Sequence, residues 1–61
     1  MIYKIKAMRV GKGIKQKDFA KQLGITIQYL GKIERGNANP TIDIARKIAI
    51  LLDSTIEELF F

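Results

Sequence analysis

The chain has 61 residues, no cysteine and no histidine, and its formal net charge is +5 at pH 7. The lack of cysteine excludes disulfide bonds and thiolate zinc sites, and the lack of histidine removes the commonest general base and the Ser-His and Cys-His nucleophile systems. So short a chain also has little room for a substrate cleft. We therefore expect one small domain, residues 1–61, which is not an enzyme and binds no metal or cofactor.

Composition and hydropathy favour a globular protein. Apolar residues make up 48% of the chain and charged residues 28%, as in ordinary folded domains. The longest apolar run, Ile48 to Leu52, is too short to span a bilayer, and the first residues lack the pattern of a signal peptide. We expect a cytoplasmic protein without a membrane partner, and no small-molecule ligand is evident.

Positive charge is concentrated in the first half of the chain. Residues 1–36 carry nine Lys or Arg residues against two acidic residues, whereas residues 37–61 carry two against four. A basic region attracts polyanions, and this attraction weakens as salt is added. A solvated lysine surface that maintains solubility would give the same pattern, so charge alone does not decide between the two interpretations.

The first two helices are predicted from apolar spacing and glycine. Ile2 and Met8 belong to an apolar repeat at helical spacing, which ends before Gly11. A second helix is predicted over residues 16–23. It ends at Gly24, a residue type that commonly closes helices in the left-handed conformation.

Three further helices follow, each after a threonine. Thr26 is a candidate N-cap for a helix that runs to about Arg35, and Thr41 for a fourth helix. The segment from Thr55 to Glu58 fits the capping-box pattern of a short last helix. The inward face of the fourth helix is predicted to be Ala45, Ile48, Ala49 and Leu52. The sequence therefore predicts an all-α fold, a compact bundle of five short helices.

Residues 16–36, QKDFAKQLGITIQYLGKIERG, carry the most informative pattern. The Gly-Ile-Thr turn is too short for its two helices to lie antiparallel, so they must cross steeply, as in a helix-turn-helix. Ala20 supplies a small residue where the helices touch, and Gly24 tolerates the positive φ that the turn needs. The apolar anchors of such a pair would be Phe19, Leu23, Ile25, Leu30 and Ile33.

Over roughly residues 3 to 60, the chain resembles the phage repressor and Cro-like (XRE) helix-turn-helix family of bacterial DNA-binding regulators. The resemblance rests on Arg9 seven residues before Gln16, on Q-x-x-F-A-x-x-L-G-I-T, and on I-E-R-G followed by N-P. The later K-I-A and T-I-E-E-L-F also fit. It implies a lambda repressor-like domain whose third helix lies in the major groove of double-stranded DNA. The implied function is sequence-specific transcriptional control, with repression expected.

The resemblance also implies roles for individual residues. Gln16 is expected to bind a phosphate, Ile27 and Gln28 to read base edges, and Lys32 to face the groove. Glutamine can pair with an adenine edge, lysine with guanine or a phosphate, and isoleucine with a thymine methyl group. The full set of expected DNA-binding residues is Lys15, Gln16, Thr26, Ile27, Gln28, Tyr29, Lys32, Arg35 and Asn37.

Two further expectations concern the third helix. In relatives an arginine of the first helix pairs with a glutamate of the third, which implies a structural ion pair between Arg9 and Glu34. Gly31 is unusual within a helix, where glycine costs about 1 kcal/mol relative to alanine. We interpret it as a place where DNA approaches closely, and a loosely constrained surface position is the alternative.

At three positions the chain differs from the usual pattern of the family. Lys15 stands where a capping Ser or Thr is usual, so the second helix is expected to lack a side-chain cap. Asp53 and Ser54 replace the usual glycine and the aliphatic residue after it. We expect this replacement to weaken the turn before the last helix.

The C-terminal part holds more apolar residues than one small core needs. Ile44 and Ile50 stand where a solvated fourth helix would be polar. With their neighbours they predict an apolar patch made of Ile44, Ile50, Leu51, Phe60 and Phe61. We interpret the patch as a homodimer interface, since paired recognition helices match a two-fold operator. Overpacking, or the end of a longer protein, would also explain it.

Two other functions remain as alternatives. The same apolar surface would suit a protein-interaction module, such as an antitoxin-like partner or a domain that recruits another factor. RNA binding is disfavoured, because beyond Tyr29 no aromatic cluster is present on which bases could stack.

Overall fold

A computed structural model describes residues 4–60 of the chain. These residues form five α-helices and no strand, which confirms the predicted all-α fold. In chain order the helices are α1 (Ile5–Gly11), α2 (Gln16–Leu23), α3 (Ile27–Glu34), α4 (Ile42–Leu51) and α5 (Ile56–Phe60). Ile2, which the sequence places in the first helix, lies outside the described residues. None of the described helices has the length and apolar character needed to cross a membrane.

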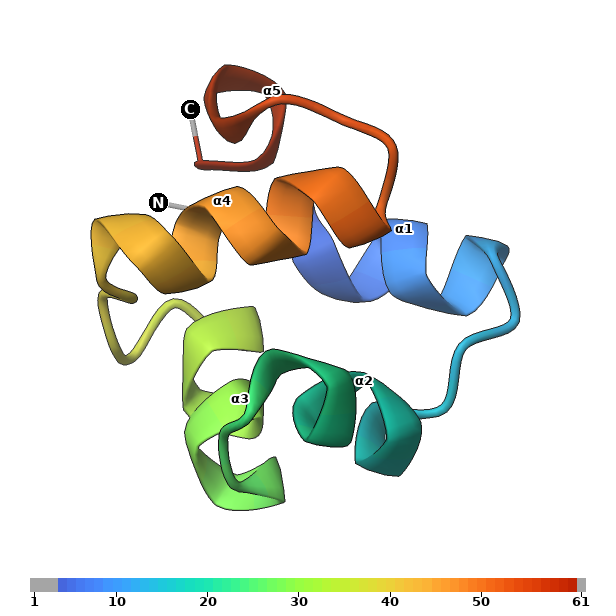
Figure 1. Cartoon of the computed structure of the whole chain (residues 1–61), viewed down its shortest axis with the longest axis vertical. Helices are drawn as coiled ribbons and strands as arrows, with labels where there is room; N and C mark the ends of the chain where they lie inside the picture. The colour runs from blue at the N-terminus through green and yellow to red at the C-terminus, as the bar shows by residue number, and fades with distance from the viewer. Residues whose placement is uncertain (1–3, 61) are drawn as a thin grey trace.

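The helices are arranged with α2 and α3 at one end of the molecule and α5 at the other (Figure 1). α1 and α4 lie between these two ends. α2 and α3 are joined by a tight turn and cross steeply, as the short Gly-Ile-Thr connection predicts. The helix-turn-helix pair is therefore presented on one side of a scaffold made by the other three helices.

The angle between α2 and α3 is fixed by a single apolar core to which all five helices contribute. Its buried members are Ile5, Phe19, Ala20, Leu23, Leu30, Ile33, Ala45, Ile48, Ala49, Leu52, Leu59 and Phe60. Four of the five predicted anchors of the helix-turn-helix are in this set, and Ile25 packs against it half-buried. Burial of each large apolar side chain contributes about 1.5–3 kcal/mol, so the core holds the pair rigidly.

The helices α1 to α4 end in the same backbone motif. At the end of α2, Gly24 N–H donates to the Lys21 carbonyl at 3.2 Å and Ile25 N–H donates to the Ala20 carbonyl at 3.0 Å. Gly24 has a φ of 73°, so this is a Schellman motif closed by a left-handed residue. The corresponding left-handed residues of the four helices are Gly13, Gly24, Gly36 and Asp53.

Asp53 takes the place of glycine at the end of α4. Its φ is 53°, and Ser54 N–H donates to the Ala49 carbonyl at 2.9 Å, which completes the motif. The turn that the sequence predicts to be weakened is therefore formed. Its cost is a left-handed conformation at a residue with a side chain, which aspartate tolerates better than most residues.

Two of the predicted N-caps are confirmed. Thr26 Oγ1 accepts a hydrogen bond from Tyr29 N–H at 3.0 Å, and Thr41 Oγ1 accepts one from Ile44 N–H at 3.3 Å. Lys15, as expected, makes no side-chain capping bond within the described chain. Since Thr26 caps α3, the first turn of that helix is stabilised where the sequence places its exposed residues.

The capping box predicted for α5 is only half formed. Glu58 N–H donates to Thr55 Oγ1 at 3.1 Å, as the pattern requires. The Glu58 carboxylate, however, accepts a hydrogen bond from the Ser54 hydroxyl at 3.0 Å instead of reaching back to the Thr55 backbone. Ser54 thus contributes a hydrogen bond to this turn that the sequence did not predict.

The apolar patch predicted at the C-terminal end is smaller than expected. Phe60 is 7% exposed and belongs to the core, so its prediction as an exposed interface residue is wrong. Ile44 and Leu51 are half-buried against the core, whereas Ile50 is 76% exposed. Phe61 lies outside the described residues. Phe60 is inward because α5 docks on the core through Leu59 and Phe60, an orientation that sequence spacing in a five-residue helix does not specify.

Candidate nucleic-acid interface

The outward side of α3 carries a stripe of exposed side chains. Ile27, Gln28, Lys32 and Arg35 follow one another at helical spacing and are all exposed. The opposite side of the same helix buries Leu30 and Ile33 in the core. We call the exposed stripe, together with Lys15 and Gln16 at the start of α2, the recognition face.

The structure places the nine predicted DNA-binding residues at the start of α2 and along α3 and its ends. Seven of them are exposed, namely Lys15, Thr26, Ile27, Gln28, Lys32, Arg35 and Asn37. Gln16 and Tyr29 are half-buried. Tyr29 packs against the core, so its ring has a structural role, and its contact with DNA stays a prediction.

Ile27 is a notable member of the recognition face. It is a large apolar residue in the first turn of α3 and is 43% exposed, although an isoleucine gains free energy by burial. Gln28, beside it, carries both a donor and an acceptor on one amide. An apolar contact next to a bidentate polar contact is the combination that reads base edges in the major groove.

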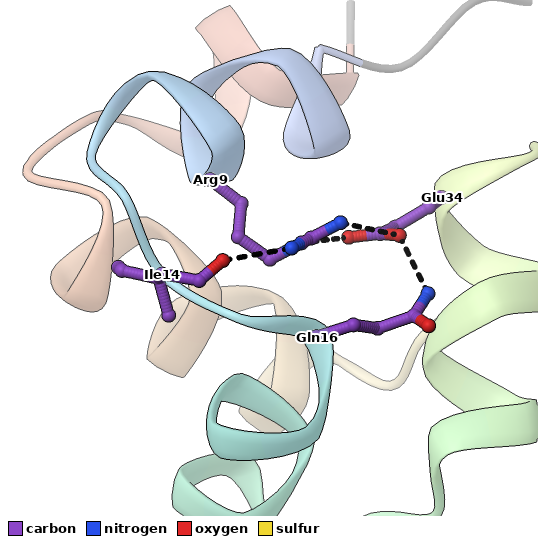
Figure 2. Close-up of polar contacts among 4 residues, drawn as sticks. All are labelled: Arg9, Ile14, Gln16 and Glu34. Carbon is purple, nitrogen blue, oxygen red and sulfur yellow. Dashed lines mark hydrogen bonds and ion pairs between the residues drawn. The ribbon is translucent and has the colours of Figure 1, made fainter.

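A buried ion pair holds α3 against the scaffold (Figure 2). Arg9 Nε donates to Glu34 Oε2 at 2.6 Å, and the two side chains are 8% and 2% exposed. Arg9 Nη1 also donates to the Ile14 carbonyl at 2.8 Å. The predicted pair between Arg9 and Glu34 is therefore present, and it joins α1, the loop before α2 and the C-terminal end of α3.

Gln16 belongs to the same polar network. Its Nε2 atom donates to Glu34 Oε1 at 3.0 Å, so the side chain extends from the start of α2 toward α3 (Figure 2). An amide nitrogen carries two hydrogens, and one remains available for another acceptor. Sequence reasoning missed this bond, because it joins side chains 18 residues apart whose meeting depends on how α2 and α3 pack.

Gly31 is buried, in contrast to its exposed neighbours on the stripe. A Cβ atom at this position would lie 3.1 Å from Arg35 Nη1 and 3.7 Å from Gln16 Nε2. The alternative of a loosely constrained surface position is therefore wrong. Two side chains of the recognition face cover this glycine.

The electrostatic character of this end is positive. Lys15, Lys17, Lys21, Lys32 and Arg35 are exposed on α2, α3 and their termini, together with the acidic residue Asp18. Glu34, the other acidic residue of the region, is buried and paired with Arg9. The surface therefore presents cations and hydrogen-bond donors, which suits a polyanion.

An all-α domain in which a steeply crossed helix pair presents such a face is a helix-turn-helix domain. The helix-turn-helix family pattern matches residues 5–59. The chain belongs to the helix-turn-helix family.

Similar proteins cover nearly the whole chain. YazB of Bacillus subtilis (strain 168), described as an uncharacterized helix-turn-helix transcriptional regulator, is 45% identical over 56 residues, which are 92% of this chain and 81% of that protein. The restriction-modification controller protein C.AhdI from Aeromonas hydrophila is 34% identical with a TM-score of 0.79, over 92% of this chain and 85% of that one. The N-terminal DNA-binding domain of SinR from Bacillus subtilis is 33% identical with a TM-score of 0.80, and the match covers 93% of this chain and 84% of that one.

Proposed function

We propose that the chain is a sequence-specific DNA-binding transcriptional regulator that places α3 in the major groove of double-stranded DNA. The observation that carries the proposal is the recognition face, an exposed stripe on a helix whose other side is fixed in the core. A helix is about 10–12 Å across with its side chains, and the major groove is about 12 Å wide. α3 is thus of the right size and is held rigidly enough to dock as a unit.

The residues of the N-terminal turn of α3 contact the base edges. Gln28 can pair bidentately with an adenine, and the exposed side chain of Ile27 can contact a thymine methyl group beside it. Lys32, one turn further along, can donate to guanine or to a phosphate. Gln28 is therefore expected to contribute more to sequence preference than to overall affinity.

Phosphate contacts come from both ends of the helix pair. Lys15 and Arg35 are exposed cations, and the Thr26 hydroxyl can still donate its hydrogen while its oxygen caps α3. The start of α2 has no side-chain cap among the described residues, so its first backbone N–H groups can also meet a phosphate. These contacts set the register of the protein on the duplex.

The similarity of the chain to other helix-turn-helix proteins supports transcriptional regulation through DNA binding. YazB is named a transcriptional regulator, C.AhdI a controller protein and the SinR fragment a DNA-binding domain. We further propose repression, because occupying a promoter requires only DNA binding, whereas activation requires a productive contact with the transcription machinery as well.

The proposal is tested by duplex binding in a salt series, with Gln28→Ala compared with Gln22→Ala. Gln22 is an exposed glutamine on α2 outside the recognition face, so it is a matched control. Wild-type affinity should fall steeply with salt, and Gln28→Ala should lose discrimination between the operator and its base-substituted variants while it keeps non-specific binding. No duplex binding at low salt would contradict the proposal and would favour a protein-interaction module.

We also propose that the protein acts as a homodimer that brings two recognition faces to a two-fold operator. The support is Ile50, 76% exposed on α4, with Ile42 on the same helix 66% exposed. Contiguous exposed apolar patches commonly mark interfaces, and Ile44 and Leu51 of the same helix are also partly exposed. Sedimentation should give a dimer mass that Ile50→Lys reduces to that of a monomer. A monomeric wild type at tens of micromolar would contradict the dimer.

A further inference from the structure

Ile27 is an apolar side chain exposed among polar ones. Within residues 16–34, all of which the structure describes, it is the only large apolar side chain that is exposed, at 43%. Its neighbours Gln28 and Lys32 on the recognition face are polar and also exposed. Contact with another protein commonly uses a contiguous apolar patch. An isolated isoleucine among polar groups suits instead one small apolar group of a polar partner.

The structure also holds Ile27 in a defined direction. It is the first residue of α3, directly after the N-cap Thr26. Thr26 Oγ1 accepts a hydrogen bond from Tyr29 N–H at 3.0 Å, which fixes the backbone of this turn. Isoleucine is branched at Cβ, and this restricts its first side-chain torsion in a helix. The outer part of the side chain is therefore presented in one orientation.

The major groove offers one apolar group to such a side chain. Base edges there present hydrogen-bond donors and acceptors, and thymine adds the methyl group on C5. An isoleucine side chain has no donor and no acceptor, so it gains free energy from the methyl group and does not distinguish the oxygen on C4 of thymine from the amino group on C4 of cytosine. Cytosine methylated on C5 carries the same methyl group at the same ring position.

We propose that Ile27 senses the C5 methyl group of a pyrimidine and accepts thymine and 5-methylcytosine alike. The inference rests on the proposed function and adds a ligand class to it, namely duplex DNA methylated on C5 of cytosine. Methylation of a cytosine that faces Ile27 then strengthens binding without a change of sequence. Gln28 reads donors and acceptors, so the two residues respond to different features of one half-site.

The size of the effect follows from burial of one methyl group. Loss of one such contact should weaken binding about fourfold. The same ratio is expected for thymine against uracil and for 5-methylcytosine against cytosine, because isoleucine has no group that responds to the substituent on C4.

The test measures binding to an operator selected from a random duplex pool, with each thymine replaced in turn by deoxyuridine, which lacks only the methyl group. We expect one position in each half-site where this replacement weakens wild-type binding about fourfold. A cytosine–guanine pair at that position should bind about fourfold more tightly when the cytosine carries the methyl group. Ile27→Ala should lose both ratios. Each ratio compares two duplexes with the same protein, so a difference in stability between variants cancels.

Ile42→Ala is the matched control. Ile42 is the first residue of α4, follows the N-cap Thr41 and is 66% exposed, just as Ile27 follows Thr26 at the start of α3. The two variants make the same change at the same helix position, and only Ile27 lies on the recognition face. Ile42→Ala should therefore keep both ratios, whatever its effect on overall affinity.

Three results would contradict the inference. One is a wild type for which no thymine of the operator is sensitive to loss of its methyl group. Another is a pair of ratios that persists in Ile27→Ala, which would assign the effect to DNA shape. The third is a preference for thymine over uracil without one for 5-methylcytosine over cytosine. In each case the wild type still binds its operator, so the proposed function stands, whereas a wild type that binds no duplex contradicts both.

Discussion

At the scale of single residues, the buried polar network holds α3 against α1 and α2. Arg9 donates to both carboxylate oxygens of Glu34 and to the Ile14 carbonyl, and Gln16 also donates to Glu34 Oε1. Every buried side-chain nitrogen and oxygen among the described residues has a hydrogen-bond partner. A satisfied network of this kind is sensitive, because removal of either Arg9 or Glu34 leaves the charge of the other buried and uncompensated.

Arg9→Ala should therefore destabilise the fold strongly. Glu34, whose side chain is 2% exposed, would lose its counter-charge, and breaking a buried pair in this way costs about 3–5 kcal/mol. Chemical denaturation would show this as a large fall in the free energy of unfolding. The control is Arg46→Ala on the exposed side of α4, which should change stability by less than about 0.5 kcal/mol. An unchanged melting temperature for Arg9→Ala would contradict a structural role for the pair.

The residue scale also shows where sequence reasoning stops. The partners Arg9 and Glu34 could be predicted because a family resemblance links two positions 25 apart. The bond from Gln16 to Glu34 and the burial of Gly31 could not, since both depend on where side-chain ends meet between packed helices. Spacing along one helix carries no information on that geometry.

At the scale of elements, most boundaries follow from local signals. Apolar spacing, the threonine N-caps of α3 and α4 and the glycines after α2 and α3 predict these three helices closely, because each signal acts within a few residues of the helix end. The direction of Phe60 was predicted wrongly. α5 has only five residues, so its docking against the core decides which side chains are buried.

Replacement of Asp53 by glycine should stabilise the turn after α4. Asp53 holds a φ of 53°, which costs glycine little and costs other residues about 1 kcal/mol. We expect Asp53→Gly to raise the free energy of unfolding by about 0.5–1 kcal/mol, or the melting temperature by a few degrees in a domain of this size. Asp53→Ala is the comparison and should destabilise. A lower melting temperature for Asp53→Gly would show that the aspartate side chain matters more than the backbone conformation.

Comparison of the two threonine N-caps, Thr26 and Thr41, distinguishes an effect on helix stability from an effect on DNA binding. Thr26→Ala and Thr41→Ala each remove one capping hydrogen bond and should each cost about 1 kcal/mol in thermal unfolding. Only Thr26 caps α3, which carries the recognition face, so only Thr26→Ala should weaken duplex binding under conditions where both variants are folded. Equal duplex affinities for the two variants would remove Thr26 from the interface.

At the scale of the whole molecule, the positive charge belongs to the part of the chain that forms the helix-turn-helix. The basic first part of the sequence supplies α1, α2 and α3, and the two helices that carry the recognition face, α2 and α3, lie at the end of the molecule opposite α5 (Figure 1). The acidic residues of α4, its following turn and α5 lie in the other part of the chain, namely Asp43, Asp53, Glu57 and Glu58. Such polarity orients the molecule toward a polyanion before contact, which speeds association at low salt.

The most direct test of sequence-specific duplex binding is selection of bound sequences from a random duplex pool by the wild-type protein. The account predicts enrichment of one motif, with two half-sites related by two-fold symmetry if the dimer forms, and loss of base preference at one position of each half-site for Gln28→Ala. A pool that binds in a salt-dependent manner but stays random after repeated rounds would contradict the central claim, because α3 would then hold phosphates without reading bases.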